Sequence, residues 1–237
     1  MSRDFSSVEV NRSFYSLLAP STYRNWKRQV PADFRFSVKG SRYITHMKSL
    51  REVETALANF FASGVLELKG KLDTCLWQLP DSRRIAPELI AEFMSQLPAS
   101  HAEAAELATT HDERIPDFVP PRLPSAPLRH AIELRRLDAV DELVLATARS
   151  RNIAVAISHS SRWPLINQRT ANFSYLRLHG PSKLYDSEYG EAALEGWAHR
   201  ISELAEHGDV LVYFDNDGHA HAPRDAFSLM ERLTVAG

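Results

Sequence analysis

The sequence predicts an α/β protein with a TIM-barrel-like (β/α) fold, and three observations support this prediction. Seven segments have the composition and alternation of β-strands, and most of them are followed by a segment with helical periodicity. Repeated strand-helix units imply parallel strands joined by right-handed crossovers. Several strand segments end in a polar or charged side chain, which is where the strands of such barrels carry their active sites.

The seven predicted strands are short apolar runs bounded by glycine, proline or charged residues. They comprise residues 8–10, 34–39, 72–79, 129–134, 153–158, 175–180 and 210–214. A closed barrel of eight strands needs one more unit. Because only a few residues precede Val8, we expect the first strand-helix unit to be missing.

Helices are predicted between these strands from apolar residues at helical spacing. The predicted helices comprise residues 21–27, 49–63, 87–97, 138–149, 191–206 and 224–233. Ser21 is the expected N-cap of the first helix, and Gly64 lies near the expected end of the second. Residues 43–46 are predicted to form a loop. Residues 99–128 are expected to form a helix extension and a proline-rich connection within a single domain, 1–237.

Composition and charge exclude several classes of protein. The apolar fraction of 44% supports a substantial core, while the net charge of -2 gives no strong indication of nucleic-acid binding. The single cysteine, Cys75, rules out an intramolecular disulfide and fits a reducing compartment. No run approaches the roughly 20 apolar residues that span a bilayer, and residues 1–7 lack a signal-peptide core. We therefore expect a cytoplasmic protein without a membrane partner.

The segment 175–180 indicates where the site lies. The two-residue period of a strand places Tyr175, Arg177 and His179 on one face and Leu176 and Leu178 on the other. A buried cation is costly unless it is paired or meets a ligand. This strand is therefore expected to form one wall of a binding site.

The other candidate site residues lie at strand ends or in the loops that follow them. The full set of ligand-binding candidates is Asn11, Tyr15, Lys39, His46, Gln78, Arg135, Arg177, His179, Tyr185 and Asn216. The two carboxylates Glu9 and Glu133 are the candidates for acid-base catalysis. Within the ligand-binding set, a phosphate or carboxylate would be held by Lys39, Arg135, Arg177 and His179.

With these residues in hand, the chain resembles the YecE-like family, the domain of unknown function designated DUF72. The matching segments cover nearly the whole chain and are specific in combination. They are Val8-Glu9-Val10-Asn11 with Ser13-Phe14-Tyr15, Phe34-Arg35-Phe36 with Lys39, Ile44-Thr45-His46, Leu76-Trp77-Gln78-Leu79-Pro80, Glu133-Leu134-Arg135, Tyr175-Leu176-Arg177-Leu178-His179-Gly180, and Tyr213-Phe214 with Asn216. The resemblance implies a TIM-barrel-like fold. It implies little about activity, because the family has no settled reaction.

The chain departs from the family pattern at several positions. We expect the N-terminal strand and helix of the family to be missing, and Arg136 replaces a histidine that usually follows the glutamate-arginine pair. The usual paired asparagines become Asp215-Asn216, and Asp225 stands where an asparagine is common.

The leading hypothesis is a protein that binds a small phosphorylated or carboxylated ligand at the strand ends, with Glu9 or Glu133 moving a proton. One alternative is a metal-dependent phosphodiester or sugar-processing enzyme. Another is a non-catalytic binding module, in which the same cations form a structural network with Glu9 and Glu133.

A metal site could draw on His46, His179 and the two glutamates, but no compact metal-ligand motif supports it, so no metal site is assigned. The pair His219-x-His221 falls in a predicted loop with no clear partners. No cofactor is indicated. A homodimer through the unpaired edges of the strands that begin at Val8 and Val210 is a further expectation.

Overall fold

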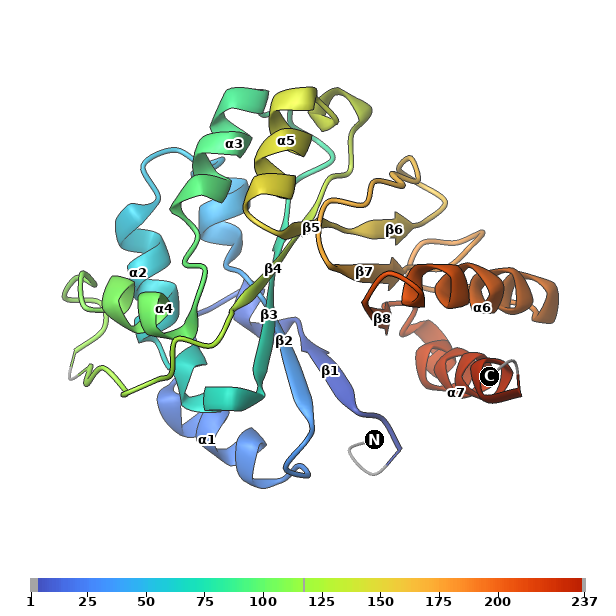
Figure 1. Cartoon of the computed structure of the whole chain (residues 1–237), viewed down its shortest axis with the longest axis horizontal. Coiled ribbons are helices and arrows are strands. Elements are labelled where there is room, and N and C mark those ends of the chain that lie inside the picture. Colours follow the sequence, from blue (N-terminus) through green and yellow to red (C-terminus); the bar gives the residue numbers. More distant parts are fainter. Residues whose placement is uncertain (1–3, 117, 236–237) are drawn as a thin grey trace. The chain divides into compact units, whose positions relative to one another are not determined.

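The structure is a computed structural model that describes residues 4–116 and 118–235. The chain divides into two compact units, residues 1–132 and 133–237, and the boundary falls inside strand β4 (Arg129–Glu133). Both units are built from parallel strands and helices, as Figure 1 shows. The predicted α/β class is therefore confirmed. The proline-rich connection lies wholly within the first unit, whereas the expectation of a single domain and of a barrel stays a prediction.

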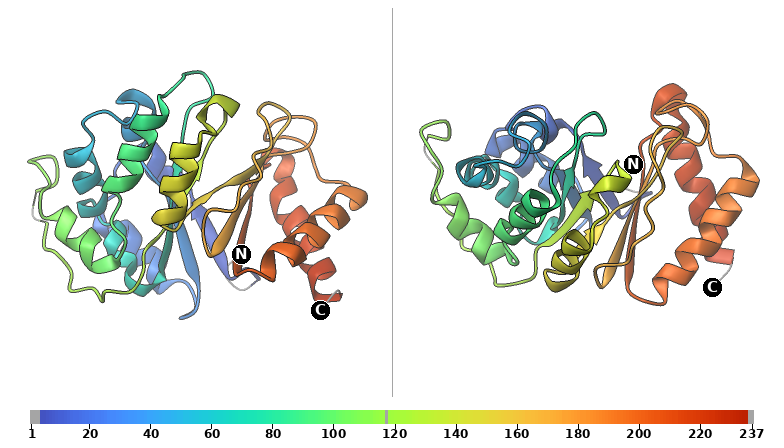
Figure 2. Two further views of the ribbon diagram at one scale, coloured as in Figure 1. Left: turned by 45° about the horizontal axis from the view of Figure 1, so that its top comes forward. Right: turned by 90° about the horizontal axis from the view of Figure 1, so that it is seen from above.

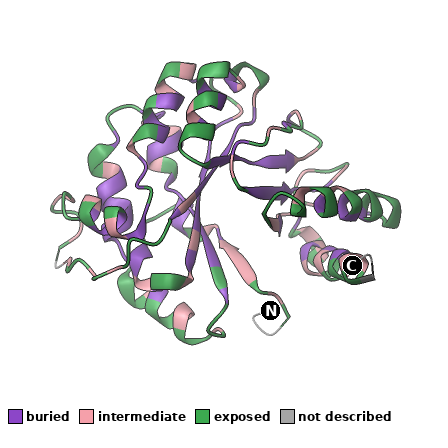
Figure 3. Cartoon of the chain, viewed as in Figure 1, coloured by how far each residue is buried: buried purple, intermediate pink, exposed green. Residues whose placement is uncertain are grey.

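The first unit contains a sheet in the order β1-β2-β3-β4. Strand β1 (Ser7–Val10) pairs in parallel with β2 (Arg35–Lys39), which pairs in parallel with β3 (Leu72–Gln78). Figure 3 shows that β2, β3 and β4 are buried over most of their length. Burial on both faces is typical of parallel sheets and explains why these strands are so rich in apolar residues.

In its described residues, the first unit also contains four α-helices and three shorter helical segments. The α-helices are α1 (Pro20–Arg28), α2 (Glu54–Ala62), α3 (Pro87–Gln96) and α4 (His101–Ala108). The shorter segments are the single turns Arg12–Phe14 and Tyr43–Met47 and the kinked 3-10 segment Val65–Lys71. Trp77 of β3 packs edge-on against Phe60 of α2 and Phe93 of α3, with ring centroids 5.3 and 5.2 Å away. A Cβ at Gly40 would lie 2.2 Å from the Trp77 ring, so only glycine fits there. This aromatic cluster joins the strands to their helices.

The second unit contains a parallel sheet in the order β6-β7-β8. Its elements are α5 (Glu142–Ser150), β5 (Ile153–Val155), β6 (Ile157–His159), β7 (Phe173–Leu178), α6 (Glu191–Ala205), β8 (Asp209–Phe214) and α7 (His221–Val235), with single turns at Leu137–Ala139 and Gly218–Ala220. Helices α6 and α7 lie side by side on one face of the sheet in Figures 1 and 2. Leu176 and Leu178 pack there against Trp197, Ile201 and Leu229. The Arg177 side chain lies on the opposite face of β7, away from these helices.

Each of the seven predicted strand segments overlaps a strand, but two differ from the prediction by more than a single terminal residue. The segment 175–180 is shifted, because β7 ends at Leu178 and leaves His179 and Gly180 beyond the strand, and the segment 153–158 is divided. Residues 153–158 form β5 and β6, which Ala156 separates. The predicted loop at 43–46 is wrong, because these residues begin a single π-helical turn, Tyr43–Met47.

Helix starts were the weakest predictions. Residues 49–53 do not join α2, because Ser49, Leu50 and Glu52 have φ values of 52°, 68° and 47°, which a right-handed helix excludes. Ser21 is not an N-cap, since Pro20 already occupies the first position of α1. Proline suits that position because it has no N–H to leave unpaired.

Two further helices also begin away from their predicted first residues. Helix α5 starts at Glu142 and not at 138, because Asp141 caps it by accepting a hydrogen bond of 2.8 Å from the backbone N–H of Leu143. Helix α7 starts at His221, three residues before the prediction. Among the described residues, no helix combines the length and the apolar character needed to cross a membrane.

Candidate functional site

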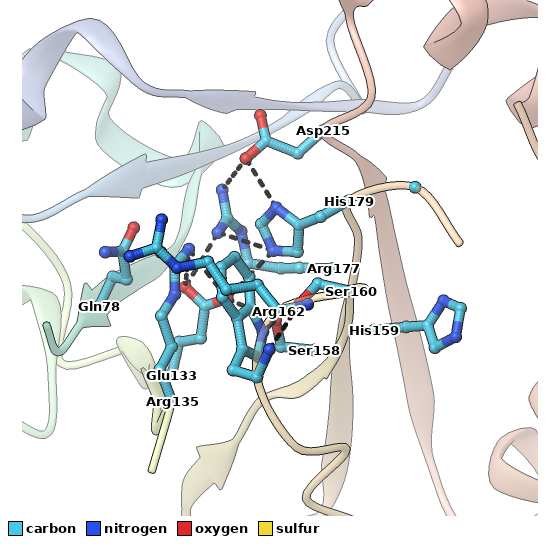
Figure 4. A network of polar contacts seen from close by, with 12 residues as sticks. Gln78, Glu133, Arg135, Ser158, His159, Ser160, Arg162, Arg177, His179 and Asp215 are labelled. Atoms are coloured by element: carbon cyan, nitrogen blue, oxygen red, sulfur yellow. Dashed lines mark hydrogen bonds and ion pairs between the residues drawn. The ribbon is translucent and has the colours of Figure 1, made fainter. Parts of the chain in front are cut away.

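A fully buried carboxylate, Glu133, is the centre of a polar network in the second unit (Figure 4). Ser158 Oγ donates to Glu133 Oε1 at 2.5 Å, and Arg177 Nη1 donates to Oε2 at 2.9 Å. Arg135 Nη2 donates to Oε2 at 3.2 Å, and His179 Nε2 lies 3.1 Å from Oε1. The carboxylate therefore has four polar neighbours, which is what a buried charge requires.

The alternation of β7 and its pairing with β6 bring these groups together. Arg177 lies on the face opposite the helices, and its register partner on β6 is Ser158. His179 follows two positions later and shares that face. The chain then turns at Gly180, where φ is 99° and a Cβ would lie 2.7 Å from the Lys183 carbonyl oxygen. Glycine is needed at this turn, which ends the strand just beyond the network.

Asp215, which follows β8, provides a second carboxylate. Arg177 Nη2 donates to Asp215 Oδ2 at 2.9 Å, and His179 Nδ1 lies 3.2 Å from the same oxygen. Both residues therefore connect Asp215 to Glu133, as the dashed lines of Figure 4 show. Each ring nitrogen of His179 thus lies near a carboxylate oxygen, but only Nε2 makes a hydrogen bond, and the buried Nδ1 has no hydrogen-bond partner.

Opposing effects act on the pKa of Glu133. Burial alone would raise this pKa, but the charges of Arg135 and Arg177 and the hydrogen bond to His179 together hold it well below its ordinary value. Glu133 is therefore an ionised carboxylate at neutral pH. Glu133 is thus better suited to orient the neighbouring cations as a fixed anion than to donate a proton.

Trp163 forms a wall of the network. The Arg135 guanidinium lies 3.8 Å from the centre of the Trp163 ring, within the range of a cation–π contact. Trp163 Nε1 donates to Ser158 Oγ at 2.9 Å, and its ring meets His179 edge-on at 5.0 Å. Arg135 Nε is buried and has no hydrogen-bond partner.

Two predicted site residues belong to a supporting layer. Asn216 Nδ2 donates to the Ser187 carbonyl at 2.9 Å and to Asp225 Oδ2 at 2.7 Å, so it holds the loop before α6. Tyr185 is more exposed, and its ring lies edge-on to His179 at 5.5 Å. In Figure 4, the His159 side chain points away from the network; its Nδ1 lies 2.8 Å from the Tyr189 hydroxyl.

The remaining predicted residues form a second group in the first unit. The Lys39 ammonium lies 4.3 Å from the centre of the Phe14 ring, which also meets Tyr15 and His46 edge-on at 5.1 Å each. Gln78 Nε2 is 3.5 Å from His46 Nε2. Phe14 thus links the cation, the tyrosine and the histidine.

Glu9 and Asn11 complete the set from the first unit. Glu9 is partly buried on β1, and Asn11 Oδ1 is buried without a hydrogen-bond partner. The assignment of Glu9 to acid-base catalysis stays a prediction.

Comparison with known proteins places this chain in a family. The family model described as "Protein of unknown function DUF72" matches residues 1–237. The chain belongs to the DUF72 family. The resemblance predicted from the sequence is thereby confirmed.

Relatives of this DUF72 protein are distant in sequence. UPF0759 protein YecE of Escherichia coli strain K12 is 23% identical over 237 residues, which cover 98% of this chain and 83% of the relative. A DUF72 family protein of Enterococcus faecalis V583 has a similar structure, with a TM-score of 0.73, 17% identity, and coverage of 97% of this chain and 85% of the other. A DUF72 family protein of Thermotoga maritima MSB8 has a TM-score of 0.71, 21% identity, and coverage of 98% and 85%. At these identities the structural likeness concerns the fold.

Proposed function

We propose that this DUF72 protein binds a small phosphorylated or carboxylated ligand at the network around Glu133, and that the Arg135 guanidinium donates hydrogen bonds to the anionic group of the ligand. The observation that carries the proposal is the state of the Arg135 guanidinium. It is buried on Trp163, yet its Nε has no hydrogen-bond partner. An unmet donor on a buried cation is costly, and an anionic ligand would satisfy it.

The lengths of the ion pairs distinguish the two arginines. Arg177 holds Glu133 and Asp215 at 2.9 Å each, the ordinary length for charge-assisted hydrogen bonds. Arg135 meets the two Glu133 oxygens only at 3.2 and 3.4 Å. Arg135 is therefore the more loosely held guanidinium and can turn donors toward a ligand.

The other groups have supporting roles in this proposal. Glu133 and Asp215 fix Arg177 and His179, so the cationic face is preorganised before a ligand arrives. His179, which lies between two carboxylates, is the group best placed to exchange a proton with a bound ligand. The residues of the first unit, Lys39 above all, stay candidates for further ligand contacts.

The test is a titration with inorganic phosphate and then with phosphorylated and carboxylated metabolites, followed by calorimetry and thermal melting. A ligand that binds only the folded protein raises its stability by about 2.7 kcal/mol at 100 times its dissociation constant. We expect Arg135→Gln to weaken binding at least about tenfold, because a hydrogen-bonded charge is lost. Failure of every anion to bind, or unchanged affinity in Arg135→Gln, would overturn the proposal.

Arg136→Gln is the matched control. Arg136 is the next residue in the chain, but its guanidinium is partly exposed and pairs with Asp138 at 2.9 Å. The control removes the same charge from the same loop and should leave binding intact.

Turnover separates an enzyme from a binding module. If the protein catalyses a reaction on the bound ligand, Glu133→Gln should lower its rate while the protein stays folded. If it is a binding module, Glu133→Gln changes only the affinity for the ligand, because it alters the position of Arg135. No turnover is then found with any ligand that binds.

We also propose the barrel fold, a cytoplasmic location and a homodimer, which the sequence led us to expect. In the described part of the chain, β1 and β8 are the outer strands of their sheets. Outer strands with unpaired backbone groups favour pairing with another copy. Light scattering on the purified chain that gives the mass of a monomer would contradict the dimer.

A further inference from the structure

A cluster of metal-binding side chains lies outside the network around Glu133. Asp186 comes from the loop between β7 and α6, His219 lies in the turn Gly218–Ala220, and His221 is the first residue of α7. One ligand atom of each residue lies within 4.8 Å of the ligand atoms of the other two. Of the described residues, these are the one group of three that meets this criterion.

The two loops are held together by backbone as well as by side chains. The backbone N–H of Gly218 donates to the Tyr185 carbonyl at 2.9 Å. A Cβ at Gly218 would lie 2.1 Å from Asp186 Oδ1, so only glycine allows the loop of His219 to approach this closely. The approach places the two histidines beside the carboxylate before any ion binds.

The carboxylate is already oriented for a cation. Lys183 pairs with Asp186 Oδ2, and His219 Nδ1 contacts Oδ1 at 2.7 Å. One oxygen of Asp186 is thus held by Lys183, and the other faces His219.

His221 supplies the second observation. Its Nδ1 is buried and has no hydrogen-bond partner, and Glu188 Oε2 lies 3.7 Å away from it. A surface ion pair between His219 and Asp186 accounts for those two residues, but it leaves the buried nitrogen of His221 unexplained. The ring of His221 therefore has bonding capacity that a metal ion bound at the cluster could use.

We propose that Asp186, His219 and His221 bind a divalent transition-metal ion, with zinc as the best fit. Imidazole and carboxylate ligands suit zinc, whereas magnesium and calcium favour oxygen ligands. Tetrahedral zinc with bonds of about 2.1 Å places its ligand atoms roughly 3.4 Å apart. The donor atoms lie within 4.8 Å of one another, and the contact of 2.7 Å between His219 and Asp186 has to lengthen when an ion enters. The His219 side chain is exposed and has room for this adjustment.

Three protein ligands leave one position of a tetrahedral ion open. The open position suits water, a substrate oxygen or the neighbouring carboxylate of Glu188. Lys183 then acts as the outer partner that orients the ligating carboxylate. The ion would lie in the same unit as the proposed anion site. The two sites are also connected through Tyr185, which precedes Asp186 and contacts the ring of His179. This proposal concerns metal binding alone and does not depend on the anion site.

The test is calorimetric titration of the chelator-treated full chain with zinc in a phosphate-free buffer. We expect one zinc ion per chain, and at least about tenfold weaker binding in both His219→Ala and His221→Ala. Cobalt substitution should give the visible absorption of a tetrahedral ion in the wild type and lose it in the variants. Thermal melts without metal establish that each variant is folded.

His199→Ala is the matched control, because His199 is an exposed histidine of α6 that contacts Glu203 at 3.3 Å. This variant should bind zinc as the wild type does. The absence of a stoichiometric site in the wild type overturns the proposal, and so does equal affinity in the wild type and the two site variants. Because no anion is present, this result is independent of the phosphate titrations.

Discussion

Arg177 Nη1 lies 2.9 Å from Glu133 Oε2, and both side chains are fully buried. A buried ion pair adds little net stability compared with apolar residues of the same volume, because both charges lose their hydration. Removal of only one partner is nevertheless strongly destabilising, because the other charge stays buried without its counter-charge. The stability of a single-residue variant therefore tests whether the pair is buried.

Replacement of Arg177 by methionine should destabilise the protein by about 3–5 kcal/mol, because it leaves Glu133 buried with less compensation. Urea unfolding of the two proteins measures the difference. Arg149→Met is the control, since Arg149 pairs with Glu142 at 2.8 Å on the surface. The loss there should be about 1 kcal/mol or less. Equal losses in the two variants would contradict the buried network.

The depressed pKa of Glu133 predicts a pH dependence of stability. A carboxyl whose pKa is lower in the folded state contributes stability above its unfolded pKa and loses it as the pH falls through the folded value. The loss should therefore begin near pH 4–5, around the ordinary pKa of about 4.3, and continue as the pH falls further. Unfolding free energies at a series of acidic pH values measure this dependence.

Glu133→Gln isolates the contribution of this group. The variant should be less stable than the wild type at pH 7, and the difference should shrink as the solution becomes more acidic. A difference that stays constant down to the acid unfolding transition would mean that Glu133 has an ordinary pKa.

The periodicity of single elements determined how much of this site the sequence could predict. The alternation along β7 was enough to place Arg177 and His179 on one face. The prediction that polar residues at the C-terminal end of a strand form the site was enough to select Glu133 and Arg135, at and just after the end of β4. Trp163 was missed, because it lies in an irregular segment where no period indicates a direction.

Contacts between loops were also out of reach. The spacing of His219 and His221 was noticed, but Asp186 is 33 positions from His219, and the loop conformation that joins them depends on Gly218. Asp215 was noted only as a departure from a family pattern. In each case the missing information is a turn geometry, which composition and hydropathy do not encode.

Cys75 should be inert in the folded protein. Burial, with a smaller effect of the Asp73 carboxylate, raises the pKa of its thiol, and the side chain is fully buried on β3. The thiolate is the reactive form, so a disulfide reagent should react only when the protein unfolds. The reaction rate, measured with and without urea, checks this. Fast reaction in the native state would contradict the core position of Cys75.

A matched pair of glycine substitutions in the second unit separates backbone strain from helix propensity. Gly208, with φ of 142°, lies where a Cβ would be 1.9 Å from the Asn172 carbonyl oxygen. Gly208→Ala should therefore cost more than about 1 kcal/mol, because the backbone must shift. Gly196 is inside α6, where a Cβ meets no described atom within 4 Å. Gly196→Ala should stabilise the protein by about 0.5–1 kcal/mol. Thermal and urea unfolding of both variants measure whether each substitution raises or lowers the free energy of unfolding. Stabilisation by Gly208→Ala would contradict the turn conformation before β8.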